Sequence, residues 1–382
     1  MRIVLITANY QPAMVPCGIG DYSRCLRGAL QALGHQCAVI TSIRSQSQER
    51  DVHRLPGRWD RHDTLAVTHI LRAARPDAVL LQYTPEHYGF GLAFKLMPLL
   101  LRRGPAAPHT VTTFHTLVGG RWISQPYAAL LAATSRSLVS TNAELTALFR
   151  RRLPRWGTKL HEIPIGANLP APRLDQADAR QRLRRLLDLD LAAHVIGSFG
   201  FPAPGKGLET LFQALHALGD PPVVHLAWIG ETRAEDRDHR ARLEALAGRL
   251  GLAGRLHWLG ALPAQDAADL LSGADAYVVP YDEGASLRRG TLLAGFRVGV
   301  PIVTTTPRYL DPALRPGETI LAVPPRSVEA LAQAIRGLLG NPGAQERIRH
   351  GMRAVESRFE WPAIAAAHVA LLERDGTNGR AR

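Results

Sequence analysis

Residues 282–295, DEGASLRRGTLLAG, hold the side chains of this sequence that are best suited to bind an anion. They follow a strand-like run, AYVVPY, and lead into a helical pattern, so they form a loop at the carboxyl end of a strand, where doubly wound sheets bind ligands. We expect Ser286 to cap the helix, with Arg288 and Arg289 in its first turn. Because cations are disfavoured at a helix N-terminus, the arginine pair predicts a bound anion, which we interpret as a diphosphate. The alternative is a solvated arginine pair at a helix end.

Lys206 is a second cation suited to the same anion. A strand-like run ends at Gly200, a Pro/Gly loop follows, and Gly205, Lys206 and Gly207 open the next helical pattern. Glycines there allow close approach of the backbone, and a lysine supplies a compact charge for a phosphate. The chain has 43 Arg but only three Lys, which makes a lysine at this position informative. We predict that Lys206 contacts the diphosphate; the alternative is a surface lysine beside a turn.

The first half of the chain offers a weaker feature of the same kind. Gly18 and Gly20 follow the strand-like run RIVLITA and precede a helical pattern, an arrangement that suits a phosphate at a helix start. They do not form a dinucleotide fingerprint, because Ser23 stands where G-x-G-x-x-G needs its third glycine. The alternative interpretation is a plain loop.

His115 follows the apolar-rich run VTTF at another strand end of the first half. Its place at a carboxyl strand end favours a role in a site, and a structural histidine is the alternative. Further candidates for the rim of the site are Asp21, Tyr22 and Glu86.

Parallel strands are needed to position these loops. Short apolar runs alternate with helical patterns along the whole chain, namely RIVLITA, CAVITS, AVLLQY, HTVTTFH and SLVST, then HVIGSFG, VVHLAWIG, RLHWLG, AYVVP and PIVTTT. Such runs between helices are typical of parallel, doubly wound sheets. Because 382 residues are too many for one ordinary core, we predict an α/β protein with two such domains. Clustered Pro and Gly at residues 164–172 indicate the hinge between them.

Composition narrows the class of protein. Three cysteines lack the spacing of a metal or redox site, so we expect reduced thiols. The longest apolar stretch, residues 90–101, contains Lys95 and Pro98 and is shorter than the ~20 residues of a membrane span. Of the net charge of +13, residues 1–165 carry +11. We expect this half to meet an anionic partner such as a membrane surface; the alternative is a solvated basic surface.

The motifs together resemble those of the GT-B-fold retaining glycosyltransferases, specifically the group 1 type known as glycosyltransferase family 4. The similar segments occur in order along nearly the whole chain: PCGIGDYSRCLRGALQALGHQCAVIT, TTFHTL, IPIGANL, FGFPAPGKGLETLFQAL, LGALPAQDAADLLSGADAYVVPYDEG, GVPIVTT and RFEWPAIAAAHVALLE. The resemblance implies a GT-B architecture of two Rossmann-like domains facing a cleft. Residues 1–165 would bind the acceptor, residues 166–358 the nucleotide sugar, and residues 359–382 would form a helix crossing back to the first domain and then a flexible tail.

The resemblance also implies a reaction and its residues. A sugar would move from a nucleotide-diphosphate sugar to an acceptor hydroxyl with retention, in polysaccharide or glycolipid assembly, with no cofactor and no metal. Cationic side chains would stabilise the leaving diphosphate, and the expected catalytic residues are His115, facing the transferred sugar, with Lys206, Arg288 and Arg289. The expected donor-binding residues are Gly18, Gly20, Gly205, Lys206, Glu283, Gly284, Ser286 and Thr291. The expected acceptor-binding residues are Asp21, Tyr22 and Glu86.

The donor half departs from the family pattern. Two glutamates eight residues apart are usual ahead of the strand GVPIV, but those positions hold Ser286 and Ala294. An arginine that is usual about six residues before the lysine is also missing. We expect Arg288 or Arg289 to compensate for that arginine, and the sugar or ribose contacts to pass to Glu283, Ser286 or Thr291.

Three other functions remain open. A nucleotide-sugar 2-epimerase shares the fold, although its acid/base residues cannot be located in this sequence. A scaffold or regulatory protein with a degraded donor site would explain the missing glutamates. A nucleic-acid binder would use the basic half, but no aromatic-interleaved basic segment occurs, so we expect no nucleic-acid partner. We expect a cytoplasmic enzyme, peripheral at the inner membrane face, that binds a nucleotide sugar and a saccharide or lipid-linked acceptor.

Overall fold

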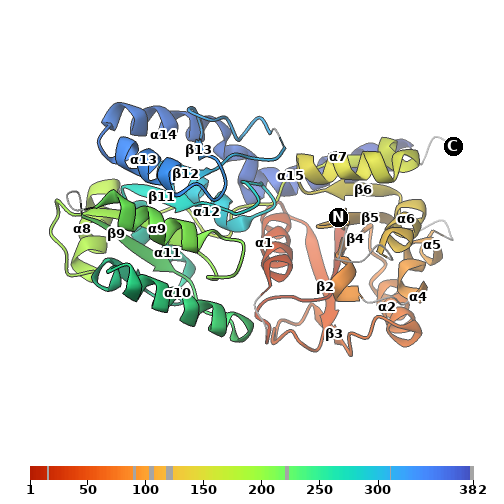
Figure 1. Ribbon diagram of the computed structural model, residues 1–382. Coiled ribbons are helices and arrows are strands. Elements are labelled where there is room, and N and C mark those ends of the chain that lie inside the picture. The colour runs from red at the N-terminus through yellow and green to blue at the C-terminus, as the bar shows by residue number, and fades with distance from the viewer. Residues whose placement is uncertain are drawn as a thin grey trace. The chain divides into compact units, whose positions relative to one another are not determined.

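The computed structural model of the chain describes residues 1–14, 17–88, 92–102, 107–117, 124–219, 223–309 and 311–378 (Figure 1). The chain divides into two compact units. Unit 1 comprises Met1–Gly166 and Arg358–Arg382, and unit 2 comprises Ala167–Ser357. Each unit contains one parallel sheet, so the predicted α/β fold with two doubly wound parallel sheets is confirmed. The end of the tail expected after the last helix, residues 379–382, lies outside the described residues.

Unit 1 contains a seven-stranded sheet in the order β3-β2-β1-β4-β5-β6-β7. Its strands are β1 (Arg2–Thr7), β2 (Gln36–Ser42), β3 (Val52–Leu55), β4 (Ala78–Tyr83), β5 (His109–Phe114), β6 (Ser137–Ser140) and β7 (Leu160–Glu162). Its helices are α1 (Gly18–Ala32), α2 (Arg61–Ala74), α3 (Pro85–Tyr88), α4 (Leu92–Lys95), α5 (Met97–Leu100), α6 (Ser124–Thr134), α7 (Ala143–Arg152) and α15 (Trp361–Asn378). The strand order reverses between β1 and β4, which makes their carboxyl ends the switch point of this sheet.

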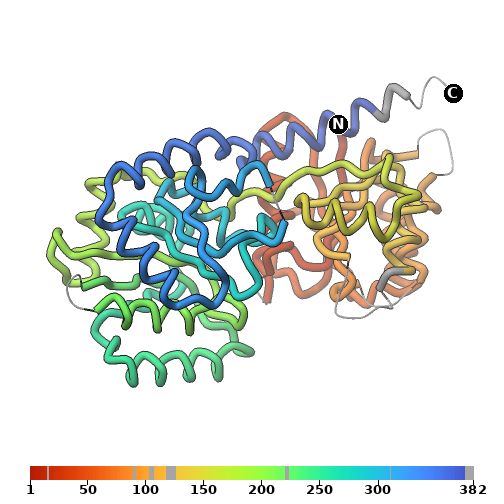
Figure 2. Tube along the Cα trace, turned by 45° about the horizontal axis from the view of Figure 1, so that its top comes forward, coloured from red at the N-terminus to blue at the C-terminus, as the bar shows by residue number. Residues whose placement is uncertain are grey.

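Alternate side chains of the central strands of unit 1 pack on opposite faces of the sheet. Ile3 and Leu5 of β1 belong to a core with α1 and with α15, the blue C-terminal helix that packs against α1 (Figure 2). Val4 and Ile6 belong to the other core, with α2. Helix α15 therefore covers a sheet whose strands all lie in the first 162 residues of the chain.

Unit 2 contains a six-stranded sheet in the order β10-β9-β8-β11-β12-β13. Its strands are β8 (His194–Phe199), β9 (Val224–Ile229), β10 (Leu256–Trp258), β11 (Ala276–Val279), β12 (Ile302–Thr305) and β13 (Leu321–Val323). Its helices are α8 (Gln176–Leu186), α9 (Leu208–Leu218), α10 (Arg237–Arg249), α11 (Ala264–Ser272), α12 (Gly290–Val298), α13 (Val328–Leu339) and α14 (Pro342–Glu356). Here the order reverses between β8 and β11.

All ten predicted strand runs contain a strand of the structure, and three further strands were missed. These are β3, β7 and β13, each of three or four residues and each at the edge of its sheet. An edge strand has a neighbour on one side only, so it can be short and polar, as VHRL and LHE are. Such segments lack the continuous apolar run that marks a buried strand.

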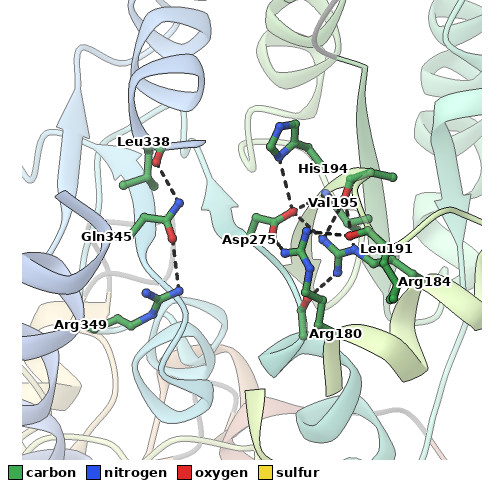
Figure 3. Close-up of polar contacts among 11 residues, drawn as sticks. Arg180, Arg184, Leu191, His194, Val195, Asp275, Leu338, Gln345 and Arg349 are labelled. Atoms are coloured by element: carbon green, nitrogen blue, oxygen red, sulfur yellow. Dashed lines mark hydrogen bonds and ion pairs between the residues drawn. The ribbon is translucent and has the colours of Figure 1, made fainter. Parts of the chain in front are cut away.

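A buried ion-pair cluster fixes the amino ends of β8 and β11. Asp275, just before β11, accepts a hydrogen bond from the fully buried Arg184 (2.7 Å) and another from the backbone N–H of Val195 in β8 (2.8 Å) (Figure 3). Arg180 also pairs with Asp275, and Arg184 donates to the Gly273 carbonyl (2.9 Å). The two central strands of unit 2 are thus joined at the end opposite to their carboxyl edge.

Candidate active site

The candidate site in unit 2 lies where the loops after β8 and β11 leave adjacent strand ends. The first loop, residues 200–207, leads from β8 to α9, and the second, residues 280–289, leads from β11 to α12. The backbone N–H of Asp282 donates to the Gly205 carbonyl (3.2 Å) and so links the two loops. This is the switch point of a doubly wound sheet, where such folds bind ligands.

Glycines allow the two loops to pack this closely. Gly207 has φ +71°, and a Cβ there would lie 1.9 Å from the Pro280 carbonyl oxygen. Gly200 has φ +99°, and a Cβ there would lie 2.5 Å from the Thr291 methyl group and 2.9 Å from Lys206 Nζ. The absence of side chains at both positions brings Lys206 and Thr291 to the end of β8.

Lys206 is a half-buried cation without a carboxylate partner among the residues that the structure describes. Its Nζ lies 5.8 Å from the centre of the Trp228 ring. Burial, followed by repulsion from Arg289 and Arg233, lowers the pKa of Lys206 to about 7. A bound anion would relieve this repulsion and favour the charged form of the lysine.

The acidic and basic residues of the second loop pair with each other. Glu283 lies 3.3 Å from Arg288 and 3.7 Å from Arg289. The Arg289 guanidinium also lies over the Tyr281 ring, 4.4 Å from its centre. Arg289 is 21% exposed and Arg288 is 44% exposed, so the two cations are not equivalent. In this structure the anion beside the arginine pair is a side chain of the same loop.

The start of α12 differs from the prediction. The helix begins at Gly290, so Arg288 and Arg289 precede its first turn, and Arg289 itself is the N-cap residue. Ser286 does not cap the helix: its hydroxyl accepts from the Arg288 N–H (3.4 Å) and its carbonyl from the Arg289 N–H (3.1 Å), in a turn that precedes the helix. Neither this helix nor α9 has a side-chain cap, which leaves their first turns suited to an anion.

The remaining candidates in unit 2 shape the two loops. Thr291 shares a hydrogen bond with the Tyr281 hydroxyl (2.6 Å), and its methyl group lies against Gly200. Gly284 has φ +93°, and a Cβ there would lie 2.5 Å from the Thr306 carbonyl oxygen. Gly205 has φ +82° with open space around its Cβ position. The local packing therefore explains why a threonine stands at position 291 and a glycine at position 284.

The glycines of unit 1 open α1 near the end of β1. Gly18 is the first residue of the helix, and a Cβ there would meet nothing within 4 Å. At Gly20 a Cβ would lie 3.4 Å from the Asn9 carbonyl oxygen. Asp21 follows in the first turn, where burial raises its pKa.

His115 and Tyr22 lie together in unit 1. The His115 ring nitrogen Nε2 lies 3.0 Å from Gln82 Oε1, and the Tyr22 ring meets the His115 ring edge-on with 4.8 Å between centres. The Tyr22 hydroxyl is hydrogen-bonded to Nε2 of the buried His368 in α15 (3.1 Å). Tyr22 is only 3% exposed, and its ring packs beside that of His115.

Glu86 lies in the short helix α3, directly after β4. Its carboxylate is exposed and accepts a hydrogen bond from the Thr84 hydroxyl (2.6 Å). The neighbouring His87 is half-buried, and this burial lowers its pKa. Glu86 and His87 therefore stand at the same edge of the sheet as His115.

The residues that the structure describes contain no group of three or more His, Cys, Asp or Glu side chains arranged to hold a metal ion. No helix formed by these residues is long and apolar enough to cross a membrane.

Comparisons with known proteins agree with this architecture. Residues 193–341 match the family model described as "Glycosyl transferases group 1". The chain is 28% identical to the glycogen synthase of Mycobacterium tuberculosis, over 96% of this chain and 93% of that protein. It is 26% identical to the phosphatidyl-myo-inositol mannosyltransferase of Mycobacterium leprae, over 70% and 68%. The structure of Anabaena HepE in complex with UDP and glucose aligns with a TM-score of 0.77 at 17% identity, covering 98% of this chain and all of that one.

Residues 193–341 belong to the group 1 glycosyltransferases, and the chain has the GT-B fold. A sucrose-phosphate synthase from Thermosynechococcus elongatus has the same fold, with a TM-score of 0.75 and 21% identity over 99% of both chains. The predicted resemblance to glycosyltransferase family 4 is thereby confirmed.

Some residues of the candidate sites in the two units were not anticipated. Gln82 interrupts the apolar run AVLLQY, and this single polar residue in a buried strand is the signal that could have pointed to it. His368 is fully buried in α15 and joins Tyr22 across 346 positions, so no local pattern links the two. Arg233, whose guanidinium lies over the Phe201 ring at 4.9 Å, likewise comes from a loop that the sequence did not distinguish.

Proposed function

We propose that this glycosyltransferase moves a sugar from a nucleoside-diphosphate sugar to a hydroxyl group of a saccharide or lipid-linked acceptor, with retention of configuration. The observation that carries the proposal is Lys206: a half-buried cation with no carboxylate partner among the described residues, next to Arg289 at the switch point of a parallel sheet. A desolvated cation beside two other cations is costly even with the partial compensation from Asp236, and a diphosphate is the ligand that would offset that cost. The N-termini of α9 and α12 add favourable backbone dipoles.

The proposed reaction breaks one bond at the anomeric carbon and forms another. The bond from that carbon to the diphosphate oxygen breaks, and the acceptor oxygen bonds to the same face of the sugar. The leaving diphosphate takes the proton of the acceptor hydroxyl. Lys206 and Arg289 stabilise the negative charge that grows on the leaving group, which is the largest contribution expected of such a site. We assign His115 to a hydroxyl of the transferred sugar.

The proposal also covers the metal requirement of the reaction and the location of the protein in the cell. Since side-chain cations supply the charge, we propose that transfer needs no metal, and activity should survive dialysis against EDTA. The relatives include a phosphatidyl-myo-inositol mannosyltransferase and a lipopolysaccharide core glycosyltransferase of Rhizobium meliloti, and these names favour glycolipid or polysaccharide assembly. The basic first half favours peripheral binding at the inner face of the membrane.

A thermal-shift screen tests the donor site directly. UDP is the first nucleotide to try, followed by GDP, ADP and the glucose conjugate of each. A ligand at ~100 times its dissociation constant stabilises the folded state by ~2.7 kcal/mol. The shift should disappear in the double variant Arg288→Ala/Arg289→Ala and persist in Arg237→Ala/Arg242→Ala, which removes the same charge from the exposed side of α10. A protein that responds to none of the six ligands would contradict the proposal.

A further inference from the structure

Gln82 is a buried polar residue, and a contribution to the stability of the fold does not explain its presence. It is 1% exposed and occupies the second-last position of β4, in an otherwise apolar run. Within the described part of the chain, its side-chain Oε1 bonds to His115 and its Nε2 has no partner. A buried amide N–H without an acceptor destabilises the folded state, and a methionine of similar shape would avoid that destabilisation. Polar groups kept at such a cost are expected where function requires them.

The sheet itself sets the distance between Gln82 and His115. Gln82 pairs with Thr113 of β5, and because side chains alternate along a strand, Thr113 and His115 point to the same face as Gln82. The ladder continues one step further, since the His115 N–H donates to the Tyr83 carbonyl (3.0 Å). The contact between the two side chains is therefore held by the backbone of two central strands.

A second contact holds the plane of the His115 ring. Tyr22 of α1 meets it edge-on, with 79° between the ring planes. The Tyr22 hydroxyl is in turn fixed by His368 of α15. Two helices and two strands thus converge on one imidazole.

The hydrogen bond between Gln82 and His115 selects one tautomer of the His115 imidazole. Burial, with smaller effects of His87 and His368, lowers the pKa of His115 to about 3, so the imidazole is neutral at physiological pH. A neutral imidazole has one N–H donor and one acceptor nitrogen, and an amide oxygen can only accept. With Oε1 of Gln82 facing Nε2, the proton resides on Nε2 and the lone pair on Nδ1.

We propose that Gln82 is a positioning residue that holds His115 in the Nε2–H tautomer and so presents Nδ1 as the acceptor for a hydroxyl group of the sugar. The part concerning the sugar rests on the proposed function, in which His115 contacts the transferred sugar. The part concerning the tautomer depends only on the contact between the two side chains.

Long-range ¹H–¹⁵N spectra of the full chain with labelled histidine test the tautomer. The His115 signals, assigned with a His115→Gln variant, should show Nε2 protonated and Nδ1 unprotonated at pH 7. In Gln82→Met the ring should become a mixture of both tautomers. Thr113→Val is the matched control, because it removes another buried unpartnered polar atom from the same face and takes no part in the hydrogen bond between Gln82 and His115. A wild-type proton on Nδ1, or a Gln82→Met ring that stays in the Nε2–H form, would overturn the proposal.

Kinetics separate positioning from a merely structural role. We expect Gln82→Met to slow the release of UDP from UDP-glucose about tenfold, the effect of one hydrogen bond, with an unchanged dissociation constant for UDP and an unreduced melting temperature. In a His115→Ala background the same substitution should have no further effect. If His115→Ala slows the reaction and Gln82→Met does not, the Gln82 proposal fails alone. If His115→Ala changes nothing, the assigned role of His115 fails, and the spectra still decide the tautomer.

Discussion

At the residue scale, the candidate donor site consists of cations in unequal surroundings. Lys206 is half-buried beside other cations, Arg289 is half-buried over the Tyr281 ring, and Arg288 is exposed. Desolvated charges interact more strongly with an anion than exposed ones, whose interactions are screened by water and salt. The three residues should therefore contribute to donor binding in different degrees.

Replacing each arginine separately tests this ranking. Arg289→Ala should weaken UDP binding by about 10- to 100-fold, in line with the ~1.5–3 kcal/mol of a hydrogen bond to a charged group. Arg288→Ala should weaken it less than about fivefold, because exposed ion pairs contribute ~0–1 kcal/mol. Isothermal titration calorimetry with UDP measures both dissociation constants. An equal or larger effect of Arg288→Ala would contradict the ranking.

The pKa of Lys206 predicts a pH dependence of donor binding. Its pKa in the free protein is lowered to about 7, so the lysine is charged below this pH and loses its proton above it. A diphosphate binds the charged form better, and UDP binding should weaken by about tenfold or more as pH rises from 7 to 9. Lys206→Arg keeps its charge over this range and should abolish the slope. A flat profile for the wild type, or an equal slope for the variant, would refute the assignment.

At the element scale, unit 2 depends on the junction of β8 and β11. Their carboxyl ends carry the two site loops, and their amino ends are joined by Asp275 with Arg184 and Val195. Removing one partner of a buried ion pair leaves an uncompensated charge, which is far more costly than removing the same pair at a surface. The stability of this junction can therefore be tested by a pair of matched substitutions.

Asp275→Asn should lower the free energy of unfolding by about 3–5 kcal/mol, because Arg184 would remain buried without its carboxylate. Asp266→Asn is the control: its pair with Arg182 (2.8 Å) is exposed on both sides, and its loss should change stability by less than about 1 kcal/mol. Scanning calorimetry of the full chain measures both changes. Similar melting curves for the two variants would show that the junction is not a source of stability.

At the scale of the whole molecule, the charge is unevenly distributed. Residues 1–165 carry +11 of the total of +13. In the structure, Arg150, Arg151 and Arg152 form an exposed basic cluster at the end of α7. An anionic bilayer attracts a nearby arginine by about 1 kcal/mol.

Vesicle sedimentation tests whether this charge binds a membrane. The protein should sediment with phosphatidylglycerol vesicles but not with phosphatidylcholine vesicles at low salt, and high salt should release it. Replacing the three α7 arginines by glutamine should weaken this binding about a hundredfold. The same replacement at Arg237, Arg242 and Arg249 of unit 2 should have little effect. Equal sedimentation with both lipids would favour a saccharide acceptor in solution.

The sequence by itself determined the fold class and most of its strands. Ten continuous apolar runs between helical patterns specify buried parallel strands, because only burial on both faces favours such runs. It also identified Lys206 and the arginine pair, since glycines and cations at strand ends are local signals that need no knowledge of the packing. The short edge strands β3, β7 and β13 gave no such signal.

The tertiary structure decided which of these residues meet. The packing of two loops decides the pairing of Glu283 with both arginines, the burial of Lys206 and the delayed start of α12. Loop conformation does not follow from a periodic sequence pattern. The convergence of Gln82, His115, Tyr22 and His368 depends on strand register and on a helix from the far end of the chain. Contacts over such separations arise from the shared burial of distant segments, which no local stretch of sequence reveals.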